Sequence, residues 1–296
     1  MPDTPAQVVD TRVLQEFTPW AGIVPGGYFA YFLGNKTRAD YWAFSKETRA
    51  LYDRERFEAF SGPSIDDNIF DWLVLLEAVV ETRREFTMAA IGAGWGRWLV
   101  AAVYAVRQRG DVRCRLIGIE AEPTHFRWMR EHFLDNGINP DDHDLIEAAA
   151  TGRSGEGWFY VGKPDAWYGQ SLIADEALDN KAPGSQVDYM GEKAMRVRTI
   201  DLATVAANYT RIDYLHMDAQ GAELDILSNA TEVLDGKVKR VLVGTHSAEI
   251  ERGLREMFRS LGWRLQYDVP MNGQAKISDT VVTLGDGVQV WINPAL

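Results

Sequence analysis

The sequence predicts a doubly wound α/β fold with a mainly parallel sheet and one antiparallel strand. From about residue 87 onward, short apolar runs of strand length alternate with segments of helical periodicity, the pattern of parallel α/β proteins. A glycine-rich turn at 92–96 joins the first strand to its helix, and Glu120 ends the next strand. Two late apolar runs, 263–269 and 281–292, close the chain as a hairpin-like pair, which adds one antiparallel strand to the sheet.

The first 65 residues differ in composition from the rest of the chain. They combine a high density of aromatic side chains with proline and glycine, and no long periodic pattern precedes residue 39. We expect residues 1–65 to form a separate N-terminal segment and residues 66–296 to form the main domain. The segment is either a packed cover on the sheet or a lid or dimerisation arm over the substrate mouth, and these roles are compatible. Its aromatic residues are Phe17, Trp20, Tyr28, Phe29, Tyr31, Phe32, Tyr41, Trp42 and Phe44.

Start and stop signals support the helices of the main domain. Asp66 to Asn68 offer an N-cap for an amphipathic helix whose apolar positions begin at Ile69. Pro123 suits the first turn of a later helix, which Gly137 ends. In chain order, helices are predicted at 69–80, 97–109, 123–136, 202–209, 222–234 and 248–261.

Short apolar runs between these helices predict the strands. Residues 152–191 interrupt the pattern, because they are rich in glycine, proline and aspartate and are too long for an ordinary connection. We interpret this segment as an irregular functional loop. In chain order, strands are predicted at 87–91, 116–119, 144–150, 195–200, 212–217, 238–243, 263–269 and 281–292.

The glycine-rich turn has the spacing G-x-G-x-G. A dinucleotide fingerprint requires a third small residue at position 97, where this chain has Arg97, so NAD fits poorly, and no Gly-Lys-Ser/Thr follows to make a P-loop. The spacing suits an adenosine cofactor without a pyrophosphate, whose amino-acid tail lies along the loop, and S-adenosylmethionine (SAM) fits. A plain connection between strand and helix is the alternative. The predicted cofactor contacts are Gly92, Ala93, Gly94, Trp95, Gly96 and Glu120, whose carboxylate would accept hydrogen bonds from the ribose hydroxyls.

Composition and charge limit the partners and the compartment. The formal net charge is −12 and no block rich in Lys and Arg interrupts it, which argues against nucleic acid or an anionic membrane surface as a partner. The N-terminus lacks the basic and apolar regions of a signal peptide, and no apolar run is long enough to span a membrane. Cys114 is the single cysteine. We expect a cytoplasmic protein that acts on a small molecule, and the N-terminal segment could support a homo-oligomer.

Residues 211–227, RIDYLHMDAQGAELDIL, contain the most specific motif of the chain, D-x-x-G-A-E. Together with VRTIDL at 197–202 and the glycine-rich turn, this segment resembles the FkbM family of SAM-dependent methyltransferases. The resemblance covers about residues 65–295. It implies a seven-stranded Rossmann-like sheet, SAM as the donor, and transfer usually to a hydroxyl oxygen of a sugar, polyketide or other small metabolite.

The resemblance also implies roles for single residues. It makes the glycine-rich turn and Glu120 the cofactor contacts, and it places Asp218 at the end of the fourth core strand, facing the donor methyl. The chain departs from the family pattern at three positions. Ala90 replaces an acid that normally precedes the turn, His216 replaces a lysine, and Gln220 replaces a glutamate. Because of Ala90, a pseudoenzyme or binding protein that retains the sheet without methyl transfer is the alternative function.

Two strand ends supply the candidate catalytic groups. Asp218 ends one core strand and His246 follows the next, so both should face one pocket at the carboxyl edge of the sheet. An alcohol acceptor must lose a proton, and we predict His246 as the general base because imidazole titrates near neutral pH. The alternative is that His246 caps the following helix or binds a backbone carbonyl.

The same neighbourhood could also hold a metal. Asp218, Gln220, Glu223 and His246 could bind a divalent ion that lowers the pKa of the acceptor. We do not favour a metal, because the carboxylate of Glu223 falls in the first turn of a predicted helix, where the helix dipole stabilises it without an ion.

The long segment 152–191 offers candidate substrate contacts. Its aromatic, hydroxyl and amide side chains suit a wall against a small organic acceptor, and they equally suit a cover on the sheet edge. The candidate substrate residues are Trp167, Tyr168, Gln170 and Ser171, with Gln220 from the strand end.

Overall fold

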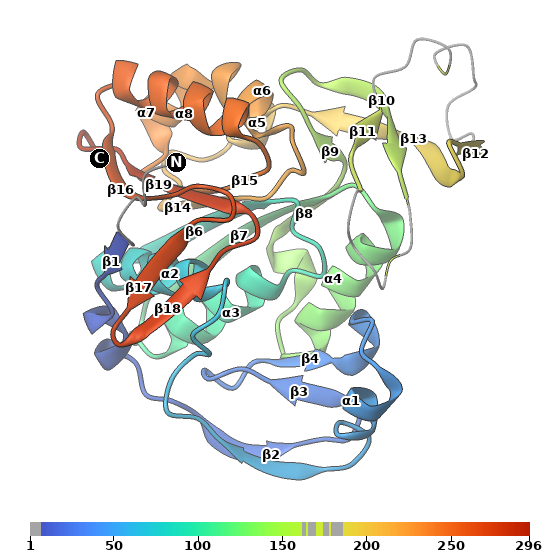
Figure 1. Cartoon of the computed structure of the whole chain (residues 1–296), viewed down its shortest axis with the longest axis vertical. Coiled ribbons are helices and arrows are strands. Elements are labelled where there is room, and N and C mark those ends of the chain that lie inside the picture. Colours follow the sequence, from blue (N-terminus) through green and yellow to red (C-terminus); the bar gives the residue numbers. More distant parts are fainter. Residues whose placement is uncertain (1–6, 162–163, 165–169, 174–177, 179–185) are drawn as a thin grey trace.

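The computed structural model describes residues 7–161, 164, 170–173, 178 and 186–296. Its centre is a seven-stranded sheet in the order β16-β19-β15-β14-β6-β7-β8 (Figure 1). β19 pairs antiparallel with both of its neighbours and the remaining pairs are parallel, so the predicted sheet with one antiparallel strand is confirmed. The strands are β6 (Glu85–Ile91), β7 (Arg113–Glu120), β8 (Asp144–Glu147), β14 (Tyr214–Met217), β15 (Arg240–Thr245), β16 (Arg264–Val269) and β19 (Gly287–Ile292).

Alternate side chains of the strands enter two separate apolar layers. On β6, Met88 and Ala90 belong to one buried cluster, whereas Ala89 and Ile91 belong to the other. Both faces of the sheet are therefore covered by helices, as parallel sheets require. Helices α2 (Ile69–Glu81), α3 (Arg97–Arg107) and α4 (Pro123–Asp135) cover the first face, and α5 (Leu202–Val205), α6 (Glu223–Ser228), α7 (Thr231–Lys237) and α8 (Ala248–Ser260) cover the second (Figure 1).

A second, five-stranded sheet lies beside the main one (Figure 1). The prediction of an irregular loop at 152–191 was wrong where β10, β11 and β12 form, and the predicted strand 144–150 is divided between the two sheets. Glycine and aspartate in this segment lower its local strand propensity, so the sequence does not indicate these strands. β10 is stabilised instead by pairing with β13, about 40 residues later in the chain. The strands are β9 (Ala149–Ala150), β10 (Gly155–Tyr160), β11 (Leu172–Ile173), β12 (Gln186–Tyr189) and β13 (Glu192–Ile200).

The predicted strand 281–292 is broken into two. Its first part forms a hairpin with the preceding strand, and its second part enters the main sheet only at Gly287. The break lies at Gly285 and Asp286, where the chain crosses from one sheet to the other. A small three-stranded sheet results, made of β1 (Gln7–Val9), β17 (Gln274–Ile277) and β18 (Thr280–Thr283).

The N-terminal segment packs against α4 (Figure 1). Arg38 pairs with Glu131 and Asp135, each at 2.6 Å, and Thr37 Oγ1 lies 3.0 Å from His132 Nε2. The segment thus covers α2 and α3 as well as α4, through contacts such as Phe32 with Trp72 and Tyr31 with Arg97, and its roles as a lid or in dimerisation stay predictions. Its other elements are β2 (Ala21–Val24), β3 (Tyr28–Ala30), β4 (Lys36–Arg38), α1 (Lys46–Ala50) and β5 (Arg56–Ala59).

No helix within the described residues is long and apolar enough to cross a bilayer.

Candidate active site

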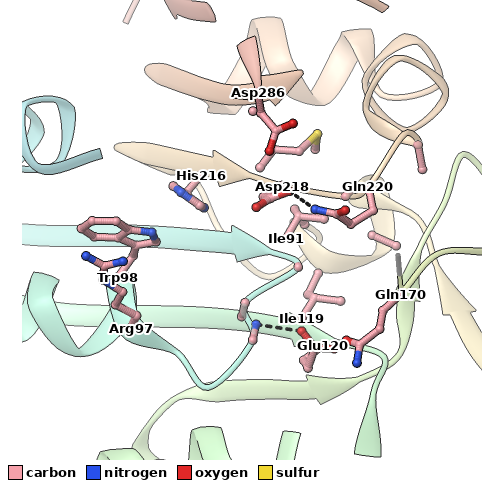
Figure 2. A pocket seen from close by; sticks show the side chains of 18 of the residues that line it. Ile91, Arg97, Trp98, Ile119, Glu120, Gln170, His216, Asp218, Gln220 and Asp286 are labelled. Carbon is pink, nitrogen blue, oxygen red and sulfur yellow. Dashed lines mark hydrogen bonds between the residues drawn. The ribbon is translucent and has the colours of Figure 1, made fainter. Parts of the chain in front are cut away.

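A cavity of about 250 Å³ opens at the carboxyl ends of β6, β7 and β14. This is the edge at which doubly wound sheets bind their ligands. Figure 2 shows Glu120 and Gln170 on one side of the cavity and Arg97 and His216 on the other, with Asp218 between them. The cavity therefore brings together residues from both halves of the sheet.

The glycine-rich turn follows β6 and forms part of the cavity wall. Gly92, Gly94 and Gly96 all have positive φ, at 69°, 54° and 72°, a conformation that glycine adopts without strain. A Cβ on Gly92 would lie 1.9 Å from the carbonyl oxygen of Asp218, so only glycine fits there. A Cβ on Gly94 would meet no atom within 4 Å, which leaves room for a ligand beside the loop.

Hydrogen bonds fix the loop to the end of β7. Ala93 donates its backbone N–H to the carbonyl of Ile119 at 2.9 Å, and Gly94 donates to Glu120 Oε2 at 2.7 Å. The other oxygen of Glu120 accepts the backbone N–H of Glu122 at 2.8 Å. Burial raises the pKa of Glu120 to about 7, although these backbone donors favour its charged form. Glu120 is therefore a buried carboxyl that lines the cavity and titrates near neutral pH.

Trp95 anchors the loop from its other side. Its ring is buried and packs against Tyr41 and Trp42 of the N-terminal segment, with ring centroids 6.0 and 5.2 Å away. The backbone carbonyl of Trp95 lies 3.0 Å from His132 Nδ1 on α4. The N-terminal segment thus supports the predicted cofactor loop, a relationship that the sequence did not indicate.

Asp218 and Gln220 form the wall at the end of β14. Gln220 Nε2 lies 2.8 Å from Asp218 Oδ1 and 3.1 Å from His246 Nε2. The surrounding protein restricts the solvation of the Asp218 carboxyl and raises its pKa, an effect that His246 and His216 partly offset. Asp218 is thus a stronger proton acceptor than an ordinary surface carboxylate.

His246 lies behind this wall and does not line the cavity. Its Nδ1 is 2.8 Å from Glu223 Oε1, and its Nε2 is 3.4 Å from Asp218 Oδ1 and 3.9 Å from Asp286 Oδ2. Burial lowers the pKa of His246, but the hydrogen bond with Glu223 and the three negative charges outweigh it, so the pKa is raised. His246 is therefore next to the cavity and in contact with Asp218, and its role as the general base stays a prediction.

Three of the residues considered for a metal lie together. Asp218, Glu223 and His246 each offer a ligand atom, and these atoms lie within 4.8 Å of one another. Glu223 Oε1 also accepts the backbone N–H groups of Ala219 and Gly221, at 3.1 and 3.0 Å. Glu223 therefore organises the turn after β14, a role that requires no ion.

The end of the cavity opposite Glu120 contains charges that sequence reasoning missed. Asp71, in the first turn of α2, lies 2.8 Å from His216 Nε2 on β14. Arg97, the first residue of α3, donates to Asn68 Oδ1 at 3.0 Å. The sequence did not identify Asp71 as a functional residue, because one acid in an amphipathic helix predicts only a polar face.

Asp286, which also lines the cavity, was missed because it fell within a predicted strand, although the sequence Gly-Asp-Gly is a turn signal.

The candidate substrate residues are only partly within the described chain. Gln170 is 8% exposed and lines the cavity, as does Gln220. Ser171 accepts the backbone N–H of Tyr160 with its carbonyl at 3.0 Å. Trp167 and Tyr168 lie outside the described residues.

Known proteins were compared with this chain by sequence and by structure. A family model described as the methyltransferase FkbM domain matches residues 89–264. A protein of Jannaschia sp. (strain CCS1), described as a candidate methyltransferase, is 28% identical over 208 residues, which cover 69% of this chain and 71% of that protein. Two solved structures are similar, both at low identity. Methyltransferase FkbM from Methylobacillus flagellatus KT is 10% identical with a TM-score of 0.44, and the match covers 77% of this chain and 55% of that one. Precorrin-6y C5,15-methyltransferase from Geobacter metallireducens GS-15 is 12% identical with a TM-score of 0.41, and the match covers 86% of this chain and 94% of that one.

The family model covers more than half of the chain, and it includes the glycine-rich turn, Glu120 and the segment around Asp218. The resemblance drawn from the sequence is thereby confirmed, and the protein belongs to the FkbM family of methyltransferases.

Proposed function

We propose that this methyltransferase uses SAM and transfers the methyl group to a hydroxyl oxygen of a small metabolite, such as a sugar or a polyketide. The contact between Gly94 and Glu120 is the observation that supports SAM best. It holds a buried carboxyl at one end of the cavity, beside a loop with open space at Gly94. A ribose could hydrogen-bond to Glu120 while the rest of the donor follows the loop.

Unpaired polar atoms in the cavity wall support the same ligand. Gln170 Nε2 and His216 Nδ1 are buried, and within the described part of the chain neither has a hydrogen-bond partner. Buried polar groups are normally paired, and a ligand can supply the missing partner. The two atoms lie at opposite ends of the cavity (Figure 2). The residues present therefore fit a long ligand with polar groups at both ends, as SAM has.

The acceptor would lie beside Asp218. Bound SAM supplies a methyl group on a sulfonium, so an oxygen–carbon bond forms as the carbon–sulfur bond breaks and the hydroxyl proton must leave. Holding the acceptor in line with that carbon can provide much of the acceleration. We propose that Asp218 receives the proton. His246 Nε2 lies 3.4 Å from Asp218 Oδ1, and Gln220 Nε2 donates a hydrogen bond to the same oxygen at 2.8 Å, so both side chains orient the carboxylate.

The acidic side chains near the proposed acceptor position disfavour an anionic substrate. Asp218 and Asp286 both line the cavity, and they would repel an anionic acceptor. The net charge of −12 likewise disfavours RNA or DNA. A neutral hydroxyl compound fits this surface.

A metal is not part of the proposal. The contacts of Glu223 with the turn after β14 account for its position, and we expect chelation to leave turnover unchanged. Activity would be measured after dialysis against EDTA. A loss that magnesium or manganese restores would make Asp218 and His246 metal ligands instead.

Two experiments test the function. Titration calorimetry of the 296-residue protein with SAM and with S-adenosylhomocysteine should give heat of binding. No binding of either compound would favour the alternative, a binding protein that retains the sheet. Incubating cell extract with donor carrying a labelled methyl group, with and without the enzyme, would then identify the acceptor.

A further inference from the structure

We infer that Asp71 and Arg97 bind the charged amino-acid tail of the donor. Asp71 receives the ammonium group, Arg97 receives the carboxylate, and His216 positions Asp71. The inference rests on the proposed use of SAM and adds a charge-specific site at the end of the cavity opposite Glu120. Figure 2 shows Arg97 and His216 together at that end.

The pair Asp71 and His216 supplies the negative end. The Nε2 atom of His216 lies 2.8 Å from Asp71 Oδ1, and the two side chains are 7% and 15% exposed. Both residues line the cavity. When Nε2 donates its proton to Asp71, the carboxylate is held in one orientation and Nδ1 is left as an acceptor. That Nδ1 atom is buried and has no partner within the described residues, so a cationic N–H donor would satisfy it.

Arg97 supplies the positive end. Its guanidinium lies over the rings of Tyr31 and Trp98, at 4.7 and 4.4 Å from their centroids, and Nη1 donates to Asn68. The Nε atom is buried and, in the described part of the chain, has no acceptor. Arg97 is also the first residue of α3, where free backbone N–H groups favour an anion. A guanidinium held by two rings and an amide is pre-organised to bind a carboxylate.

The register of the main sheet places Ala90 beside the histidine that contacts Asp71. Ala90 on β6 is paired with His216 on β14, so their side chains lie on the same face of the sheet. Ala90 is 2% exposed and packs within the apolar cluster, so it contributes no charge to the cavity. The negative charge at this end comes instead from Asp71 on α2, which contacts the imidazole beside Ala90, and from Asp67 just before that helix.

Calorimetry of the 296-residue protein with four ligands distinguishes the contribution of Asp71 to binding from that of Arg97. SAM and S-adenosylhomocysteine carry the whole tail, decarboxylated SAM lacks the carboxylate, and 5′-methylthioadenosine lacks the tail. Asp71→Asn should weaken binding of the first three ligands by about tenfold or more and leave 5′-methylthioadenosine unchanged. Arg97→Gln should weaken only SAM and S-adenosylhomocysteine. Asp235→Asn, which removes an exposed charge on α7, is the matched control and should change none of the four affinities.

The outcomes distinguish this inference from the proposed function. If the unmodified protein binds neither SAM nor S-adenosylhomocysteine, the proposed function fails. If it binds them but Asp71→Asn lowers the affinity for all four ligands equally, Asp71 has only a structural role and the inference is wrong. Unchanged affinities in both variants would also overturn it. Melting temperatures of the unliganded variants show whether each is folded, and Arg97→Gln provides an independent test if Asp71→Asn is not.

Discussion

The backbone N–H of Gly94 donates a 2.7 Å hydrogen bond to Glu120, which ties the glycine-rich loop to the end of the neighbouring strand. The same carboxyl accepts the N–H of Glu122 through its other oxygen. Glu120 therefore organises the loop before any ligand binds. A substitution of Glu120 should therefore change both the affinity for the ligand and the stability of the fold.

Glu120→Ala should weaken SAM binding by about 1.5–3 kcal/mol, the range for a hydrogen bond to a charged group. Calorimetry measures this loss. The melting temperature of the unliganded protein should also fall, because Gly94 and Glu122 lose their acceptor. SAM affinity equal to that of the unmodified protein would show that the ribose binds elsewhere.

The affinity for SAM should decrease as the pH falls below about 7. Burial raises the pKa of Glu120 to about 7, so lowering the pH protonates it, and a protonated carboxyl loses acceptor capacity for ribose hydroxyls. If only the ionised form binds, affinity at pH 6 should be about tenfold lower than at pH 8. Glu120→Gln removes the titrating group and should give a flatter profile. An equally steep profile in that variant would assign the dependence to another group.

Gly92→Ala and Gly94→Ala should have different effects. A Cβ at Gly92 would lie 1.9 Å from the Asp218 carbonyl, so this variant should unfold at a clearly lower temperature. A Cβ at Gly94 would enter open space, and its positive φ costs about 1 kcal/mol, so this variant should fold but bind SAM poorly. Thermal melts and calorimetry on both proteins check the contrast. Normal SAM binding by folded Gly94→Ala would contradict the role of the loop.

Asp218→Asn should lower kcat by about 10²–10⁴-fold if Asp218 receives the substrate proton. His246→Gln should lower kcat less and shift the pH profile, because His246 contacts Asp218 but does not line the cavity. SAM affinity should be retained in His246→Gln. Steady-state rates across pH test both variants, and a larger loss in His246→Gln than in Asp218→Asn would restore His246 as the direct base.

Ala90→Glu should destabilise the protein without tightening SAM binding. Ala90 is 2% exposed within the apolar layer of α2 and α3, and an added carboxylate there would be a buried charge. We expect the free energy of unfolding, measured in urea, to fall by about 3 kcal/mol or more. Tighter binding with an unchanged melting temperature would mean that position 90 is open to the donor.

Much of this protein can be predicted from its sequence, because the relevant signals are local. Apolar periodicity predicts the parallel strands and their helices, and the late hairpin-like pair predicts the single antiparallel strand β19. The glycine-rich turn, Glu120 and Asp218 follow from their places at strand ends, since those ends share one edge of a doubly wound sheet. Each of these features depends on residues that are close together in the chain.

Other features depend on how distant segments pack against one another. The second sheet forms because β10 and β13 pair, and the break before β19 brings Asp286 to the cavity. Asp71 and His216 are 145 residues apart and meet only when α2 packs against the sheet. His246 follows a core strand as predicted, yet its contact with Glu223 holds it behind Asp218. Sequence patterns specify elements and their ends, whereas the pairing of side chains from separate elements is decided by tertiary packing.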